Sequence, residues 1–244
     1  MIEFGFGARQ FGGFKIKYPE EVEFAKTNNF DFIQIWYDAK SGLEINLSEN
    51  KEKTIKESKF PSIIHAVLDV TEIEEHIRKL IPILRYLGNK ELIIHPHSNI
   101  LKGNEAFLKL INVINFAVEE LSKEGITVYL ENNSRLNPIF WTSVEIKKVF
   151  DQILELEFLL DIAHIDDTKH LEDMVAIKYP KILHIADRHL EVIHEHLPIG
   201  GGNIDFEYIF KNPLVKFDGK VIFEVTKSTK DLIESKNKIY ELVR

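Results

Sequence analysis

Several short apolar segments of this sequence end in a side chain that can bind a metal ion. In the second half of the chain, four such residues follow one another: Glu131, Asp161, His184 and Glu224. Taken singly, each has an ordinary interpretation, as a helix cap, an ion-pair partner or a core histidine. Three carboxylates in one partly buried site, however, repel one another unless they are paired or bind a cation. The pattern therefore predicts a divalent metal site formed by these four residues.

Histidines near the ends of other apolar segments could add imidazole ligands to this site. They are His65, His95, His164, His194 and His196. Core packing, a helix cap or contact with a substrate are alternative roles for them. The sequence contains no cysteine, so a metal must be held by imidazole and carboxylate groups. This ligand set suits zinc, manganese, cobalt or iron, and we expect one to three ions.

The segments that end in these residues alternate with stretches of helical periodicity. We predict strands at 2–7, 32–36, 62–66, 91–95, 127–131, 157–161, 181–185 and 220–225. Capping boxes at Thr71–Glu74 and Thr142–Glu145 predict two helix starts, and Gly88 predicts a helix end. His76 and His170 fall in helical segments and are predicted to be solvated.

Eight strand–helix pairs in 244 residues predict an α/β fold, a (β/α)₈ TIM barrel, as a single domain over residues 1–244. A doubly wound open sheet has the same alternation. It would spread the strand ends apart, whereas a closed barrel brings all of them to one face. The predicted ligands therefore favour the barrel. The irregular segment 186–204 contains three consecutive glycines and is predicted to be a functional loop.

Composition narrows the range of functions. The chain is 44% hydrophobic and has no apolar stretch near the roughly 18 residues of a membrane span, so we expect no membrane insertion. The N-terminus carries Glu3 where a signal peptide would carry positive charge, which predicts a cytoplasmic protein. A net charge of −8 makes nucleic-acid binding unfavourable without excluding it. A small-molecule substrate is expected, and the oligomeric state is not predicted.

Three motifs carry a resemblance to a known family. They are Leu160–His164, His184–Asp187 and the run His196–Phe206, and their order and spacing are similar to the signatures of the xylose isomerase-like TIM barrel superfamily. That superfamily includes sugar and sugar phosphate isomerases and epimerases, hydroxypyruvate isomerase and the endonuclease IV class of apurinic-site nucleases. The resemblance covers nearly the whole chain and implies that Glu131, Asp161, His184 and Glu224 are the shared metal ligands.

The branches of the superfamily imply different chemistry. In the epimerase-like branch one metal acts as Lewis acid, and Glu131 and Glu224 remove and return a proton on carbon. The nuclease branch implies three zinc ions, which would also be bound by His65, His95, His164 and the pair around His196. The nuclease pattern has Asp-x-His where this chain has His194-Glu195-His196, which puts a third ion in doubt.

We therefore predict a divalent-metal-dependent isomerase or epimerase that acts on a sugar, a sugar phosphate or a related hydroxy-carbonyl compound. The predicted substrate contacts are His97, Asn133 and Arg188. The alternative is an endonuclease IV-like multinuclear zinc phosphodiesterase, but loops such as 67–70 and 98–101 are not basic, as DNA-binding loops would be. A second alternative is a metal-binding barrel without catalytic activity.

Overall fold

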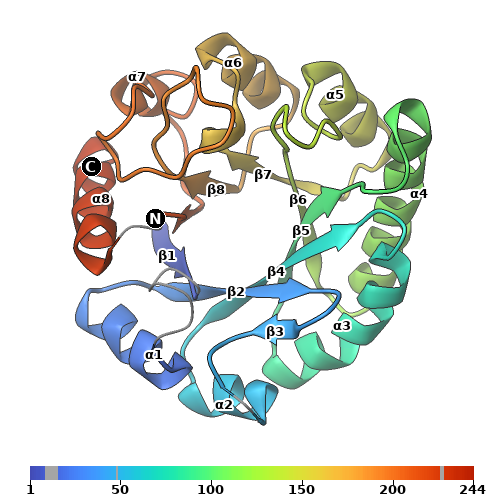
Figure 1. Cartoon of the computed structure of the whole chain (residues 1–244), viewed down its shortest axis with the longest axis horizontal. Coiled ribbons are helices and arrows are strands. Elements are labelled where there is room, and N and C mark those ends of the chain that lie inside the picture. The colour runs from blue at the N-terminus through green and yellow to red at the C-terminus, as the bar shows by residue number, and fades with distance from the viewer. Residues whose placement is uncertain (9–15, 48, 226–227) are drawn as a thin grey trace.

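The computed structural model describes residues 1–8, 16–47, 49–225 and 228–244. In this part of the chain, eight parallel strands close into a barrel (Figure 1). They are β1 (Glu3–Gly7), β2 (Phe32–Asp38), β4 (Ser62–Asp69), β5 (Glu91–His97), β6 (Thr127–Glu131), β7 (Glu157–Asp161), β8 (Ile182–Ile185) and β9 (Lys220–Phe223). The barrel closes because β1 pairs with both β2 and β9. The predicted (β/α)₈ barrel is confirmed, and the open sheet is excluded.

Helices follow the strands and surround the barrel (Figure 1). They are α1 (Tyr18–Thr27), α2 (Lys51–Ser58), α3 (Ile73–Leu87), α4 (Gly103–Ser122), α5 (Ser143–Gln152), α6 (Thr168–Ile177), α7 (Phe206–Lys211) and α8 (Thr229–Leu242). Their apolar stripes face the sheet, as Ile77, Leu80 and Leu84 of α3 show by being fully buried. Among the described residues, no helix combines the length and apolar character needed to span a membrane.

The predicted helix boundaries were right at two of three positions. Thr142 caps α5 in a complete capping box with Glu145, and α3 ends at Gly88, whose φ of 82° suits glycine. The capping box at Thr71 was wrong, because the Thr71 hydroxyl donates to Asp69 Oδ1 (2.7 Å) instead of accepting from the helix. Glu72 occupies the N-cap position of α3 without a side-chain hydrogen bond.

One strand was not predicted. β3 (Gly42–Glu44) pairs antiparallel with the end of β2 and forms a hairpin on the rim of the barrel. Asp38 turns the chain there, since its Oδ1 accepts from the backbone N–H groups of Lys40 and Ser41. Figure 1 shows β3 beside β2, on the side of α2.

An apolar layer fills the inside of the barrel below the strand ends. Its members are Phe32, Ile63, Ile93, Tyr129, Leu159, Ile182 and Ile222, one from each of seven strands. Since side chains alternate across a strand, the residue two positions later points into the barrel as well, one layer higher. The residues of the next layer in these seven strands therefore follow directly from the floor residues.

Candidate metal centre

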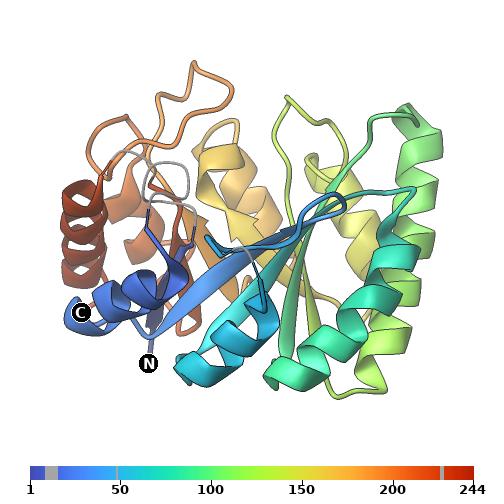
Figure 2. The same cartoon turned by 60° about the horizontal axis from the view of Figure 1, so that its bottom comes forward.

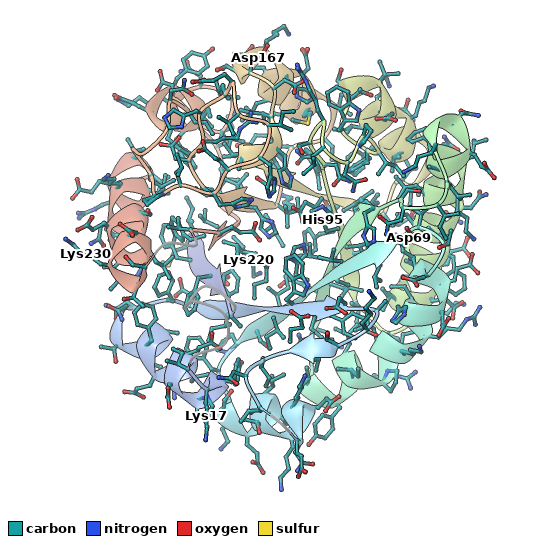
Figure 3. The ribbon with its side chains drawn as sticks, viewed as in Figure 1. Lys17, Asp69, His95, Asp167, Lys220 and Lys230 are labelled. Atoms are coloured by element: carbon teal, nitrogen blue, oxygen red, sulfur yellow. The ribbon has the colours of Figure 1, made fainter. Side chains whose placement is uncertain are left out.

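The layer above this apolar floor is polar on seven strands, and on β1 Gly7 is in register with Gln34. Two positions after each floor residue stand Gln34, His65, His95, Glu131, Asp161, His184 and Glu224. All four predicted metal ligands belong to this ring, as do two of the five additional histidines. Figure 3 shows His95 near the centre of the barrel, whereas Asp69, at the end of β4, lies further out toward α4. The alternation of the strands thus gathers residues that are far apart in sequence.

Glu131 lies at the centre of the ring and is only 1% exposed. Its Oε2 accepts a hydrogen bond from His65 Nε2 (2.7 Å). Its Oε1 lies 3.3 Å from Nδ1 of His95 and 3.3 Å from Nδ1 of His184. Two imidazole nitrogens therefore converge on one carboxylate oxygen.

Gln34 fixes the orientation of His184. The Gln34 amide donates from Nε2 to Glu224 Oε1 (3.1 Å), so its Oε1 is left to accept from His184 Nε2 (2.8 Å). Because Nε2 carries this hydrogen, a neutral His184 presents the lone pair of Nδ1 to the carboxylates of Glu131 (3.3 Å) and Glu224 (3.4 Å). This arrangement places the His184 Nδ1 lone pair beside two carboxylate oxygens, and these three acceptors repel one another. A proton or a cation between them is needed to relieve the repulsion.

The same reasoning applies to His95 and Asn133. The Asn133 amide donates from Nδ2 to the carbonyl oxygens of Pro96 and Ile139, both at 2.8 Å. Asn133 Oδ1 consequently accepts from His95 Nε2 (2.8 Å), which leaves Nδ1 of His95 directed at Glu131. Asn133 was predicted to contact substrate. It is 1% exposed, and its described contacts hold His95 in place.

Asp161 keeps one carboxylate oxygen free. Its Oδ1 accepts from the backbone N–H of Ala163 (2.6 Å), while its backbone N–H donates to Asn132 Oδ1 (2.7 Å). His164 Nδ1 lies 3.2 Å from Asp161 Oδ2 but donates to the carbonyl of Asn132 (2.9 Å). Among the residues that the structure describes, Asp161 Oδ2 is thus buried without a hydrogen-bond partner, as is Nδ1 of His184.

Without a metal, protons must balance the charge of this cluster. Burial by itself lowers the pKa of His184, but the carboxylates of Glu224 and Glu131 outweigh it and raise that pKa to about 9. Burial likewise opposes the charged form of His95, and Glu131 raises its pKa to about 9. Burial and the neighbouring carboxylates of Glu131 and Glu224 raise the pKa of Asp161 to about 7. A divalent cation could replace these protons.

The residues present fit a divalent metal. The ligand atoms of Glu131, Asp161 and His184 lie within 4.8 Å of one another, and those of His65, His184 and Glu224 form a second such group. Asp161 Oδ2 and His184 Nδ1 are buried without a hydrogen-bond partner among the described residues, so both atoms are available to a cation. The donor set is imidazole and carboxylate, as zinc, manganese, cobalt and iron prefer.

A further histidine group lies beside this centre. Ligand atoms of His164, His194 and His196 are also within 4.8 Å of one another, and the rings of His164 and His194 are stacked with centroids 5.6 Å apart. Burial, with the neighbouring His196 and His164, lowers the pKa of His194 to about 4, so this imidazole is neutral and able to bind a metal. His196 Nδ1 donates to the carbonyl of Glu224 (3.2 Å).

The loop that carries His194 and His196 is anchored by Asp187, directly after β8. Its carboxylate accepts from the backbone N–H groups of Arg188 (2.8 Å), Gly200 (2.8 Å) and Ile204 (3.3 Å). At Gly202 a Cβ atom would lie 2.4 Å from the Arg188 backbone, so only glycine fits there. Figure 2 shows this segment rising on the same side as the loop that follows β6.

A cavity of about 290 Å³ opens above the polar ring. Its lining includes Gln34, Trp36, Glu224 and the five additional histidines, but not Glu131, Asp161 or His184, which lie deeper. This volume is close to the lower end of the ~300–1,000 Å³ range of small-molecule sites. Such a cavity fits a small ligand.

Comparison with known proteins decides the family. The profile of the xylose isomerase-like TIM barrel family matches residues 22–242. The chain belongs to this family. It is 27% identical over 209 residues to the uncharacterized protein MJ1614 of Methanocaldococcus jannaschii, a match that covers 82% of this chain and 74% of that protein.

Solved structures of similar fold include several enzymes. A D-tagatose 3-epimerase-like protein superposes with a TM-score of 0.77 at 23% identity, over 99% of this chain and 97% of the other. D-psicose 3-epimerase from Clostridium cellulolyticum H10 gives 0.76 at 13% identity, over 99% of both chains. The probable 3-DHS dehydratase AsbF from Bacillus anthracis gives 0.75 at 14% identity, over 99% of both chains. At these identities the likeness concerns the fold.

In this member of the xylose isomerase-like family, the other predicted substrate contacts lie outside the cavity. His97 is at the upper end of β5, where the Asp69 carboxylate is its principal charged neighbour. Arg188 is 3% exposed and borders a second, smaller cavity. Gln34 and Trp36 of β2 line the main cavity but were not predicted. The spacing Phe32-x-Gln34 matches Ile63-x-His65, and this register could have identified Gln34.

Proposed function

We propose that the protein is a divalent-metal-dependent isomerase or epimerase of a small hydroxy-carbonyl compound such as a sugar or sugar phosphate. The observation that carries the proposal is that the carboxylates of Glu131 and Glu224 both lie close to His184 Nδ1, at 3.3 and 3.4 Å. Glu131, Asp161, His184 and Glu224 would hold the cation. When bound, it would supply Lewis-acid polarisation of the substrate's oxygen atoms.

The two glutamates have different environments, which suits two roles in proton transfer. The Glu224 side chain is 16% exposed and borders the cavity, whereas that of Glu131 is 1% exposed. The pKa of Glu224 is lowered because His184 and His196 outweigh the effect of its burial, so it is an ionised base. The pKa of Glu131 is also lowered, because His95, His184 and His65 outweigh its burial, so its carboxylate must first take up a proton. His65 Nε2 lies 2.7 Å from its Oε2. We assign proton abstraction from carbon to Glu224, and proton return to Glu131 once it has been protonated through His65. Trp36 and the histidines of the cavity would position the substrate.

The test is exchange of carbon-bound hydrogen with solvent deuterium, followed by NMR for a panel of ketoses, aldoses and their phosphates. The protein would be supplied in turn with manganese, cobalt, zinc and iron(II). We expect exchange and formation of an isomer with at least one compound, and its loss in Glu224→Gln. The absence of exchange throughout the panel, in a protein that demonstrably holds metal, would refute the proposal.

The histidine group formed by His164, His194 and His196 favours a second candidate, multinuclear phosphoester hydrolysis. A centre with more than one zinc can stabilise both the attacking and the leaving oxygen of phosphate. Its test is incubation of the zinc-loaded protein with a DNA duplex that contains an abasic site. Efficient incision, abolished in Glu224→Gln, would replace the isomerase proposal. A barrel that binds metal but gives neither exchange nor incision would be a binding protein.

Two further parts of the proposal concern the whole chain. We propose that residues 1–244 act as one domain, and that the protein works in the cytoplasm on a small carbohydrate-like substrate. The volume of the cavity supports the size of the substrate. Fractionation of the native cells and limited proteolysis would test location and domain organisation.

A further inference from the structure

A second cavity adjoins the metal centre. It has a volume of about 130 Å³, several times the ~30 Å³ that a water molecule occupies in the liquid. His164 lines both this cavity and the main one, so the two cavities are neighbours. We call this second cavity the annex. Its lining contains Ser134, Arg135, Asp166, Arg188 and Glu191.

Arg188 is a buried cation of the annex wall. It is 3% exposed, and its guanidinium donates from Nη1 to the carbonyls of Val192 (2.6 Å) and Ile193 (2.9 Å) and from Nη2 to that of Ile165. Its Nε is buried and has no hydrogen-bond partner within residues 1–8, 16–47, 49–225 and 228–244. In the part of the chain that the structure describes, the partners of Arg188 are carbonyl oxygens, and none is a carboxylate. Burial of a cation without a direct ion-pair partner is costly.

The carboxylates of Asp161, Asp166 and Glu195 act on the charge of Arg188, but none of them forms a direct ion pair with it among the described residues. Arg135 Nε lies 2.7 Å from Asp166 Oδ1, so these two side chains neutralise one another. Glu191 is exposed and accepts from Asn203 Nδ2 (3.3 Å), at the edge of the annex. Ser134 Oγ accepts from the Leu136 N–H (3.3 Å), and its own hydroxyl hydrogen remains available to a ligand.

We propose that the annex binds the anionic end of the substrate, a phosphate or carboxylate group, while the hydroxy-carbonyl end lies in the main cavity above the metal centre. This inference rests on the proposed function and narrows the substrate class to acidic sugars or sugar phosphates. A phosphate or carboxylate would supply the direct ion pair that Arg188 lacks and would accept hydrogen bonds from Arg135 and Ser134.

The binding test uses inorganic phosphate, titrated by calorimetry into the protein as purified and after treatment with a chelator. We expect phosphate binding that survives the chelator, weakens about tenfold or more in Arg135→Gln and strengthens in Glu191→Gln. Arg85→Gln is the matched control, because Arg85 is an exposed arginine that pairs with Glu124 away from the annex. The inference would be overturned if phosphate binding is lost on removal of the metal, or if the affinity for phosphate is the same in Arg135→Gln as in the wild type.

The kinetic test compares a ketose phosphate with the corresponding neutral ketose. We expect the ratio of their kcat/KM values to favour the phosphate and to fall about tenfold in Arg135→Gln. Equal turnover of both compounds would be consistent with the proposed function. It would refute the proposal that the annex binds the anionic end of the substrate. If no ketose exchanges hydrogen, the phosphate titration alone still tests whether the annex binds an anion. Arg188→Lys is a second variant, which keeps the charge but loses the three-carbonyl geometry.

Discussion

Gln34 determines which nitrogen of His184 faces the carboxylates of the metal centre. Its amide oxygen lies 2.8 Å from His184 Nε2, and its amide nitrogen donates to Glu224 Oε1 at 3.1 Å. A residue that is not itself one of the proposed ligands thus connects two of them. Partners of this kind orient metal ligands and raise their basicity.

We predict that Gln34→Leu weakens divalent-metal affinity about 10- to 100-fold, because His184 loses the acceptor that fixes its tautomer. Metal affinity would be measured by competition with a chromophoric chelator. Gln152→Leu, on the exposed side of α5, is the matched control and should bind metal as the wild type does. Wild-type affinity in Gln34→Leu would show that the amide does not orient the ligand.

Removal of the metal should lower stability. A ligand that binds only the folded state adds about 2.7 kcal/mol to the free energy of unfolding at a hundred times its Kd. For a chain of this size we expect a chelator to lower Tm by roughly 5–10 °C. Glu131→Gln and His184→Ala should lose both bound metal and the effect of the chelator on Tm.

The control for this prediction is His189→Ala, because His189 is a half-exposed loop histidine outside the proposed ligand groups. It should retain the metal and the full shift. Two results would contradict the prediction that this site binds metal. One is a protein that stays metal-free after incubation with zinc, manganese and cobalt, and the other is a Tm that the chelator does not change.

The barrel and the polar ring could be predicted because both follow from short-range periodicity. A strand buried on both faces reads as an apolar run, and a ligand at its end, such as Asp161, interrupts that run visibly. The convergence of Glu131 and Glu224 required only that the eight strand ends meet on one face. Closure of the barrel supplies that condition.

Other features depend on contacts that are distant in sequence. His76 was predicted to be solvated, which was wrong: it is 5% exposed, and its Nδ1 lies 2.7 Å from Tyr37 Oη. His170 is partly buried and donates from Nε2 to the Trp141 carbonyl (2.8 Å). Gln34 was missed because an amide in an apolar strand gives no ligand signal by itself. Its role appears only once β2 and β9 are known to share the barrel interior.

Glu21 of α1 should make stability depend on pH. It is 2% exposed, its Oε2 has no hydrogen-bond partner in the described part of the chain, and burial raises its pKa to about 8. The unfolded chain releases this proton near the ordinary pKa of 4.5, whereas the folded protein keeps it until about pH 8. Stability attributable to Glu21 therefore falls as pH rises between these values, by on the order of a few kcal/mol in total.

We expect Glu21→Met to be more stable than the wild type at pH 8 and to show little difference at pH 4.5. Urea unfolding at the two pH values would measure the change in free energy of unfolding. Glu23→Met is the matched control on the exposed side of the same helix and should not alter the pH dependence. An equal effect of Glu21→Met at both pH values would mean that packing, and not ionisation, is responsible.

The number of bound ions should distinguish the two candidate functions. If His164, His194 and His196 bind a second cation, the zinc-loaded protein should hold about two ions per chain by elemental analysis, and His194→Ala should lose about one of them. His65→Ala and His95→Ala should then reduce the metal content as well, because these imidazoles contact Glu131.

A single-metal isomerase predicts a different result. Metal content should then stay at about one ion in His194→Ala, His65→Ala and His95→Ala, while substrate turnover falls in each, since these histidines line the cavity. The decisive comparison is between His194→Ala and His184→Ala. Loss of metal in His184→Ala alone favours isomerase chemistry at one ion. Partial loss in His194→Ala together with incision of the abasic duplex favours hydrolysis at a multinuclear centre.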